Sequence, residues 1–418
     1  MRLRKTHLTA AILVILLVTC TTIAGPIESR ISAYILTLPQ SLEASTLSWC
    51  TWTGYCYIGP RLYLAPRDDG SFLVGWTDNF GHGHVSTVSG SSISATHNFT
   101  GNRVRGLVAH SDGTYAVLLK SGTTLYLSKR AANGSATWTT SLNSTIAEDS
   151  STLGGHRLAY GRGIYAAYWA VHGISGGYSG HEGDQLTGVN DSGVIQSGGW
   201  SWGCSHSMAE LVGYHSNDDL FTAFCSTDCY PDPPGLTMNN STSIYEGDGN
   251  CGGLVSVQLG QMAEAETGWK ILFNAQDTAS SVAHGVGLAT VVSGQSPTVV
   301  WLTATNGTDE RDPAMARIGS ETPEQFLVGW RTKSNGAFHL GVIDASGAFL
   351  EGPEQLSSTG PGWGNRDDSF QGTPDGGVAW VEGISGTATL TLYRYSDAGL
   401  FADGFESGDN DLWSSIVP

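Results

Sequence analysis

Histidine, tyrosine and arginine gather between residues 156 and 206, and these side chains can do acid–base chemistry on a charged substrate. Histidine titrates near neutral pH and can remove a proton, tyrosine can donate one, and arginine can neutralise a carboxylate. On a uronic-acid polymer, this set would support the elimination reaction of a polysaccharide lyase. The structural alternative is that each side chain makes hydrogen bonds beside a turn. The candidate catalytic residues are His156, Arg157, Tyr168, His172, His181 and His206.

A second candidate site follows from an internal repeat. The string Phe-Leu-Val-Gly-Trp occurs at residues 72–76 and again at 326–330, each time after a segment that begins with arginine. Weaker copies recur at roughly 40 to 55 residues, the spacing of four-stranded propeller blades. If each copy begins with an innermost strand, the polar starts converge at one mouth of a central channel; salt bridges between blades are the alternative. The candidate binding residues are Arg61, Arg105, Arg157, His206, His284, Arg311, Asp312, Arg366 and Asp367, with Trp200 and Trp202 as aromatic contacts.

The elements that position these residues are predicted to be β-strands. No segment shows a sustained 3.6-residue apolar period, and short apolar runs are separated by Gly, Asp, Asn and Ser. The 418 residues include 56 glycines and only 14% charged residues, which excludes a charged helical protein, and 13 tryptophans argue against disorder. We predict an all-β fold, a single β-propeller of six or seven four-stranded blades over residues 61–399. A β-sandwich or a two-domain β protein is the alternative.

The two ends of the chain are predicted to lie outside the blades. Residues 1–24 have the basic start, apolar run and small residues of a secretory signal peptide, with a retained anchor as the alternative. The N-terminal segment 25–60 contains a candidate closing strand, Ile31–Leu36. In the C-terminal tail, 400–418, the string Asp-Gly-Phe-Glu-Ser-Gly-Asp at 403–409 is followed by Trp413. This string resembles a tail found on many exported proteins of Gram-negative bacteria, which implies a bacterial protein that is secreted or held in the cell envelope.

Cysteine usage fits an exported chain. Without residues 1–24 the number of cysteines is even, which favours disulfides in an oxidising compartment. We expect one bridge between Cys50 and Cys56, and two bridges in an undetermined order among Cys204, Cys225, Cys229 and Cys251. No cofactor is expected. Structural zinc at Cys204, His206, Cys225 and Cys229, or structural calcium at the acidic turns 246–250 and 409–411, is the alternative.

Net charge and the absence of known motifs argue against some candidate functions and allow the others to be ranked. The formal net charge of −18 argues against general nucleic-acid binding, which depends on Lys and Arg meeting phosphates. The chain contains no His-Glu-x-x-His metal motif and no phosphate loop. The primary prediction is a secreted, monomeric propeller that binds glycans or surface polymers at one mouth, with no membrane span after processing. An exported polysaccharide lyase is the first alternative and a structural envelope protein is the second.

Overall fold

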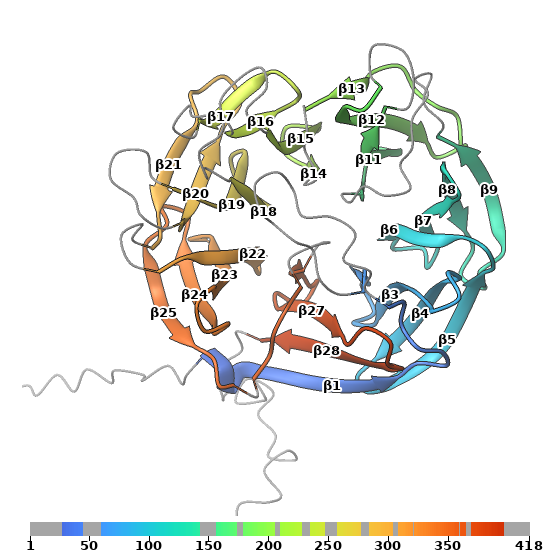
Figure 1. Ribbon diagram of the computed structural model, residues 1–418, viewed down its shortest axis with the longest axis horizontal. Helices are drawn as coiled ribbons and strands as arrows, with labels where there is room; N and C mark the ends of the chain where they lie inside the picture. The colour runs from blue at the N-terminus through green and yellow to red at the C-terminus, as the bar shows by residue number, and fades with distance from the viewer. Residues whose placement is uncertain are drawn as a thin grey trace, which may run out of the picture.

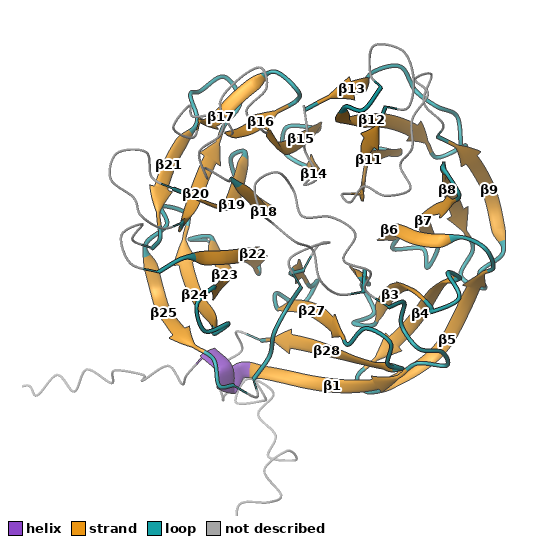
Figure 2. Ribbon diagram, viewed as in Figure 1, coloured by secondary structure: helices purple, strands orange, loops and turns teal. Residues whose placement is uncertain are grey.

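The computed structural model describes residues 27–44, 60–142, 156–173, 179–204, 210–227, 235–246, 257–276, 284–303, 308–320, 322–358, 360–364 and 369–396. These residues form seven four-stranded antiparallel sheets, arranged as blades around a central axis (Figure 1). In the same ranges, helix is limited to one 3-10 turn, η1 (Ile27–Arg30), as Figure 2 shows. Among the described residues, no helix is long and apolar enough to cross a membrane. The predicted all-β propeller is confirmed, with seven blades among the described residues.

The blades are numbered in chain order, with their strands given from innermost to outermost. Blade 1 contains β2 (Tyr63–Pro66), β3 (Phe72–Thr77), β4 (Gly83–Ser89) and β5 (Ser92–Phe99), and blade 2 contains β6 (Arg103–Ala109), β7 (Tyr115–Ser121), β8 (Thr124–Arg130) and β9 (Ala136–Ser141). Blade 3 contains β10 (His156–Gly161), β11 (Ile164–His172), β12 (Glu182–Asn190) and β13 (Trp200–Gly203), and blade 4 contains β14 (Glu210–His215), β15 (Leu220–Thr227), β16 (Gly235–Met238) and β17 (Thr242–Glu246). Blade 5 contains β18 (Gln258–Glu264), β19 (Trp269–Ala275), β20 (Gly285–Val291) and β21 (Thr298–Trp301), and blade 6 contains β22 (Glu310–Ile318), β23 (Gln325–Thr332), β24 (Phe338–Asp344) and β25 (Phe349–Gln355). Blade 7 contains β26 (Gln371–Gly372), β27 (Val378–Gly383), β28 (Thr389–Tyr395) and β1 (Ile31–Thr37).

The repeated string Phe-Leu-Val-Gly-Trp is explained by packing between blades. It lies in β3 and β23, the second strands of blades 1 and 6, whose two faces are covered by the neighbouring blades. A Cβ added at Gly75 would lie 2.9 Å from Val104 of the next blade, and one at Gly329 would lie 2.8 Å from the ring of Trp363. Glycine therefore admits the neighbouring side chain, while the apolar residues around it fill the layer between two sheets.

The ring is closed by a strand from the beginning of the chain. β1 pairs antiparallel with β28, from Ile31 opposite Tyr395 to Thr37 opposite Thr389. Blade 7 thus contains three strands from the end of the described chain and one from its start (Figure 1). The segment put forward as a closing strand lies within β1. Its Leu36 is 1% exposed and packs among apolar residues of blades 1 and 7.

The inner strands β2, β6, β10, β14, β18, β22 and β26 run in one direction, because every blade repeats the same strand order. The ring therefore has a start face, where these seven strands begin, and an end face, where they end. Connections from second to third strands also lie on the start face, since the second strand runs back toward it.

The predicted start of blade 5, at His284, is wrong. Blade 5 begins at Gln258, whereas His284 precedes β20, the third strand of that blade. The inner strand β18 begins with Gln-Leu-Gly and has no cation at its start. A search for charged blade starts therefore misses β18 and selects the next histidine, His284. His284 nevertheless lies on the start face, where its ring and its backbone N–H contact Asp309, just before β22.

Candidate functional site

The central channel contains a cavity toward the end face. Its volume is about 520 Å³, and all seven inner strands line it, including Leu107–Ala109 of β6 and Met315–Arg317 of β22. Gln261 of β18 contacts β22 and the residue just before β26: its Oε1 accepts hydrogen bonds from the backbone N–H groups of Met315 (3.1 Å) and Phe370 (2.9 Å), and its Nε2 donates to Phe370 O (3.1 Å). Hydrogen bonds between blades 5, 6 and 7 therefore fix the channel wall at this level.

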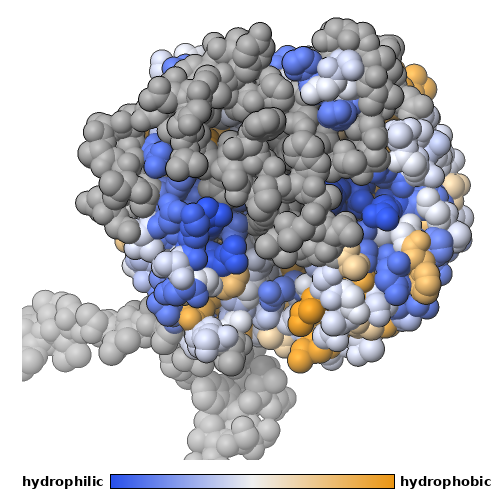
Figure 3. Space-filling model, viewed as in Figure 1, coloured by the Kyte–Doolittle hydropathy of each residue, from blue (hydrophilic) through white to orange (hydrophobic). Residues whose placement is uncertain are grey.

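Cationic residues occupy the opposite, start-face end of several inner strands. Arg105 and Arg157 lie in the first half of β6 and β10, Arg311 is the second residue of β22, and Arg61 precedes β2 by two residues. Figure 3 shows hydrophilic side chains gathered over β6 and β22. The repeat thus leads to the correct strands for these four arginines. His206, Arg366 and Asp367 lie outside the described residues.

Asp312 is held at the start of β22 from three sides. A β-bulge between Arg311 and Ala314 places Asp312 at φ +53°, an uncommon backbone conformation for a residue other than glycine. Its N–H donates to Gln258 Oε1 (3.0 Å), its carbonyl accepts from Trp363 Nε1 (2.9 Å), and its carboxylate pairs with Arg331 (2.6 Å). Burial raises the pKa of Asp312, and the charge of Arg331 opposes that rise.

Two carboxyl groups beside Asp312 have their pKa values moved in opposite directions. Burial raises the pKa of Glu310 to about 7, against a hydrogen bond from Thr332. Burial would also raise the pKa of Asp309, but hydrogen bonds from His284 (2.8 Å) and Lys333 (3.0 Å) outweigh it and hold that pKa well below the ordinary value. Near neutral pH the start of β22 therefore combines a fixed negative charge with a carboxyl group that can hold a proton.

Blade 3 contains a buried hydrogen-bonded triad next to the predicted catalytic residues. The Tyr168 hydroxyl donates to Asp184 Oδ2 (2.5 Å) and Trp200 Nε1 donates to Asp184 Oδ1 (2.7 Å). Tyr168 and Asp184 are fully buried, and burial raises the pKa of Asp184 to about 7 although both hydrogen bonds favour its ionised form. Trp200 and Trp202 lie in β13, the outermost strand, so they are distant from the channel in the order of the sheet.

Strand pairing brings most of the predicted catalytic residues to one end of blade 3. Arg157 is opposite Tyr168 in the ladder, and His172 ends β11 opposite Glu182 at the start of β12. His181 is exposed just before β12. His156 begins β10, and its side chain is not among those described. The sequence thus predicts a common location, but Tyr168 is directed into the sheet toward Asp184 and away from solvent.

Arg105 is a buried cation that lies near the start of β6. It is 3% exposed, yet its one hydrogen bond runs from Nη1 to the carbonyl of Val104 (2.7 Å), and its Nε has no partner. Among the described residues, no carboxylate forms an ion pair with it. Burying a guanidinium without a counter-charge is costly, so this residue needs an explanation beyond packing.

A disulfide joins blades 3 and 4. Cys204, directly after β13, is bonded to Cys225 of β15, and both residues are buried. Their sulfur atoms and a carboxylate oxygen of Asp184 lie within 4.8 Å of one another, the one such metal-ligand grouping in the described ranges. Two cysteines of the zinc alternative are joined to each other here, and a disulfide sulfur is not the thiolate that zinc requires. Cys50, Cys56, Cys229 and Cys251, and the calcium alternatives 247–250 and 409–411, lie outside the described residues.

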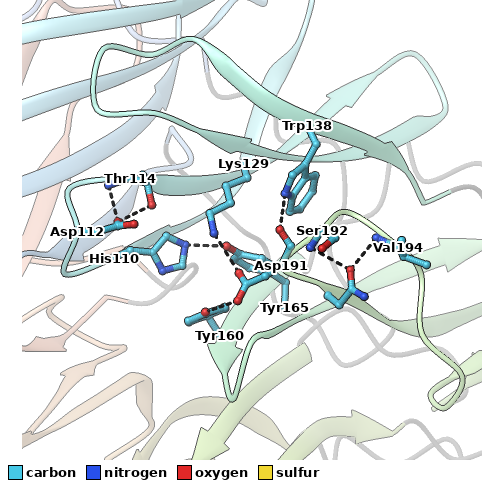
Figure 4. A network of polar contacts seen from close by, with 11 residues as sticks. His110, Asp112, Thr114, Lys129, Trp138, Tyr160, Tyr165, Asp191, Ser192 and Val194 are labelled. Atoms are coloured by element: carbon cyan, nitrogen blue, oxygen red, sulfur yellow. Dashed lines mark hydrogen bonds and ion pairs between the residues drawn. The ribbon is translucent and has the colours of Figure 1, made fainter.

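A polar network on the end face, between blades 2 and 3, was not assigned a role from sequence (Figure 4). Asp191 accepts hydrogen bonds from Lys129 (3.1 Å) and Tyr160 (2.9 Å), while His110 and the Tyr165 hydroxyl share one of 2.8 Å. Burial raises the pKa of Tyr160 to about 12 and lowers that of His110. Each of these groups has a protein partner, so the network ties two blades together at their turns.

Comparisons with known proteins give only distant structural likenesses. No protein-family model matches the sequence, and no curated protein matches it. Among solved structures, the Pan2 WD40 domain of Neurospora crassa has 9% identity and a TM-score of 0.45, covering 81% of this chain and 90% of that one. The Cps50 (Swd1) β-propeller domain of Myceliophteria thermophila has 11% identity and a TM-score of 0.44, covering 80% and 96%. A Penicillium chrysogenum alpha-L-arabinanase complexed with arabinobiose has 10% identity and a TM-score of 0.42, covering 85% and 98%.

Proposed function

We propose that the protein binds a glycan or another extracellular polymer at the start face of its propeller. The observation that carries this proposal is the position of arginines at the beginning of four inner strands, β2, β6, β10 and β22, among the residues described. In a chain with a formal net charge of −18, cations collected around one end of a channel form a local site for an acidic or hydroxyl-rich ligand.

Binding is favoured over elimination chemistry by the surroundings of Tyr168. A catalytic tyrosine must bring its hydroxyl within hydrogen-bond distance of the leaving oxygen of the substrate. The hydroxyl of Tyr168 is fully buried and donates to Asp184. Burial also raises the pKa of Tyr168 well above its ordinary value. These contacts suit a residue that orders blade 3 beneath a binding surface.

We also propose that the protein acts outside the cytoplasm as a monomer, in a bacterial envelope or medium. The bond between Cys204 and Cys225 supports an oxidising compartment, because cytosolic thiols are kept reduced. The predicted signal peptide, 1–24, and the C-terminal tail, 400–418, lie outside the described residues. Export therefore rests on the sequence patterns and on this disulfide.

The proposal is tested by glycan-array binding and by electrophoresis in gels that contain acidic or neutral polysaccharides. Retention by at least one polymer is expected for the wild-type protein, and the double variant Arg61→Gln/Arg311→Gln should migrate freely. Arg67→Gln is the matched control, since Arg67 lies in the turn after β2 on the end face and donates to Gly113 O. Equal retention of the double variant and the wild type would contradict binding at the start face. No retention by any polymer would contradict the proposed function.

A further inference from the structure

Arg105 occupies a bulge in the strand that lines the channel. Val104 pairs with Leu119 and Gly106 pairs with Leu118, so Arg105 has no opposite residue in β7. Val104 packs with blade 1, whereas a Cβ at Gly106 would lie 3.0 Å from Leu158 of blade 3. The extra residue therefore interrupts the alternation that directs side chains to the two faces of the blade. A bulge of this kind re-aims the side chain that it carries.

The bulge lies directly beyond the cavity. Leu107 is the first residue of β6 that lines the 520 Å³ cavity, and Arg105 precedes it by two residues. At about 3.3 Å per residue, this places Arg105 about 7 Å further along the channel toward the start face. The inner edge of β6 carries no partner strand, so a ligand at this level would meet backbone groups of that edge, and Arg105 lies on the same strand.

Resting on the proposed function, we propose that Arg105 binds a carboxylate of the ligand, which makes the ligand an acidic polysaccharide of the uronate type. The buried guanidinium has four N–H donors beyond the one bonded to Val104, and its planar fork matches a carboxylate in two parallel hydrogen bonds. Arg61, just before β2, and Arg157, on β10, take part in other interactions. They add positive charge at that level while Arg105 supplies the open donors.

Net charge limits how strongly acidic the ligand is. A densely charged polyanion would be repelled by a chain with a formal charge of −18, in which Asp and Glu outnumber Lys and Arg by 38 to 20. A uronate polymer carries one carboxylate on each sugar unit, so the unit that contacts Arg105 presents one charge to this one buried cation. The uronate class therefore fits the arrangement better than a heavily sulfated or phosphorylated chain.

The test compares trigalacturonate with its fully methyl-esterified form by calorimetry. The acid should bind wild type more tightly than the ester, and Arg105→Gln should weaken binding of the acid by about 10- to 150-fold, the range for losing a hydrogen bond to a charged group. Arg105→Lys, which retains the charge but loses the planar fork, should recover part of the affinity. Arg103→Gln is the matched control on the same strand: Arg103 pairs with Glu43 at the surface, so its loss should change affinity less than about twofold.

Other outcomes separate this inference from the proposed function. If acid and ester bind equally and Arg105→Gln has no effect, the inference is overturned while glycan binding stands. If neither trisaccharide nor any polymer binds, the proposed function falls, and the melting temperature is measured with galacturonate or inorganic phosphate. A rise with phosphate alone that disappears in Arg105→Gln identifies a small-anion site and overturns the polysaccharide source. No rise with either anion overturns the inference completely. The free Arg105→Gln protein should melt no lower than wild type, which shows that it is folded.

Discussion

Replacing Asp184 by asparagine should change how the stability of the protein depends on pH. The carboxyl group of Asp184 is fully buried, and its pKa is about 7 compared with an ordinary value of 3.8. Asparagine has nearly the same shape and keeps an acceptor for Trp200 Nε1, but it carries no charge at any pH. The comparison therefore isolates the free energy of ionising one buried carboxyl group.

The sign and size of the effect follow from the pKa shift. Between pH 4 and pH 7 the folded protein keeps a proton that the unfolded chain has released, so the stability contributed by this group falls as pH rises through that window. A pKa shift of about three units changes the contribution of Asp184 to the free energy of unfolding by about 4 kcal/mol in total. About 3 kcal/mol of this change occurs between pH 4.5 and pH 8. Relative to wild type, Asp184→Asn should therefore gain about 3 kcal/mol over that interval.

Urea unfolding followed by tryptophan fluorescence, at intervals from pH 4.5 to pH 8 without reductant, measures this difference. Asp191→Asn is the control. Burial would raise the pKa of Asp191, but hydrogen bonds from Lys129 and Tyr160 together outweigh it and hold that pKa below its ordinary value. Asp191 is therefore ionised in both states throughout this range, and the stability difference of Asp191→Asn should not change with pH. A difference between wild type and Asp184→Asn that stays constant from pH 4.5 to pH 8 would refute the reasoning.

Two further predictions concern how the ring is held together. Cys204→Ser and Cys225→Ser should each lower the free energy of unfolding by about 3 kcal/mol, as expected for a bond that closes a loop of 21 residues, and a reductant should destabilise wild type more than either variant. If the free energy of unfolding of wild type is the same with and without a reductant, the bond does not contribute to stability. Leu36→Ala, at a residue of β1 that is 1% exposed, should cost about 2–4 kcal/mol, whereas Ile35→Ala, at a neighbour that is 68% exposed, should cost less than about 0.5 kcal/mol. Similar costs at both positions in urea unfolding would contradict the packing of β1 in the ring.

The sequence predicts the fold where packing imposes a repeated pattern. Each second strand needs apolar residues on both faces, and in β3 and β23 the glycine before tryptophan makes room for a neighbouring side chain. Blade 5 departs from the pattern because β18 begins without a cation, and nothing in packing requires one there. The start of a blade is therefore recognisable only where function or a salt bridge adds a charged residue.

The sequence predicts which residues of the candidate site lie near one another, but it does not predict their burial, their hydrogen bonds or the bulges that carry them. Alternation along β11 and β12 brings Tyr168 and Asp184 together, but only the structure shows that both are buried and bonded to each other. The bulges at Arg105 and Asp312 have no signature in a single sequence, since they depend on the register between two strands. The end-face network likewise depends on contacts between residues as far apart as Lys129 and Asp191.

Closure by β1 has a consequence during biosynthesis. About 350 residues separate β1 from its partner β28, and at ribosomal rates of about 5–20 residues per second the gap lasts roughly 20 to 70 seconds. Throughout that time β1 has unpaired backbone groups on both edges, and the blade 7 residues against which Leu36 packs are not yet present. Until its own β28 is available, a chain can pair its β1 with the β28 of another copy, which exchanges β1 between two rings. Crowding of nascent chains should raise the fraction of such exchanged dimers, so the route to a monomer depends on how quickly the last blade arrives.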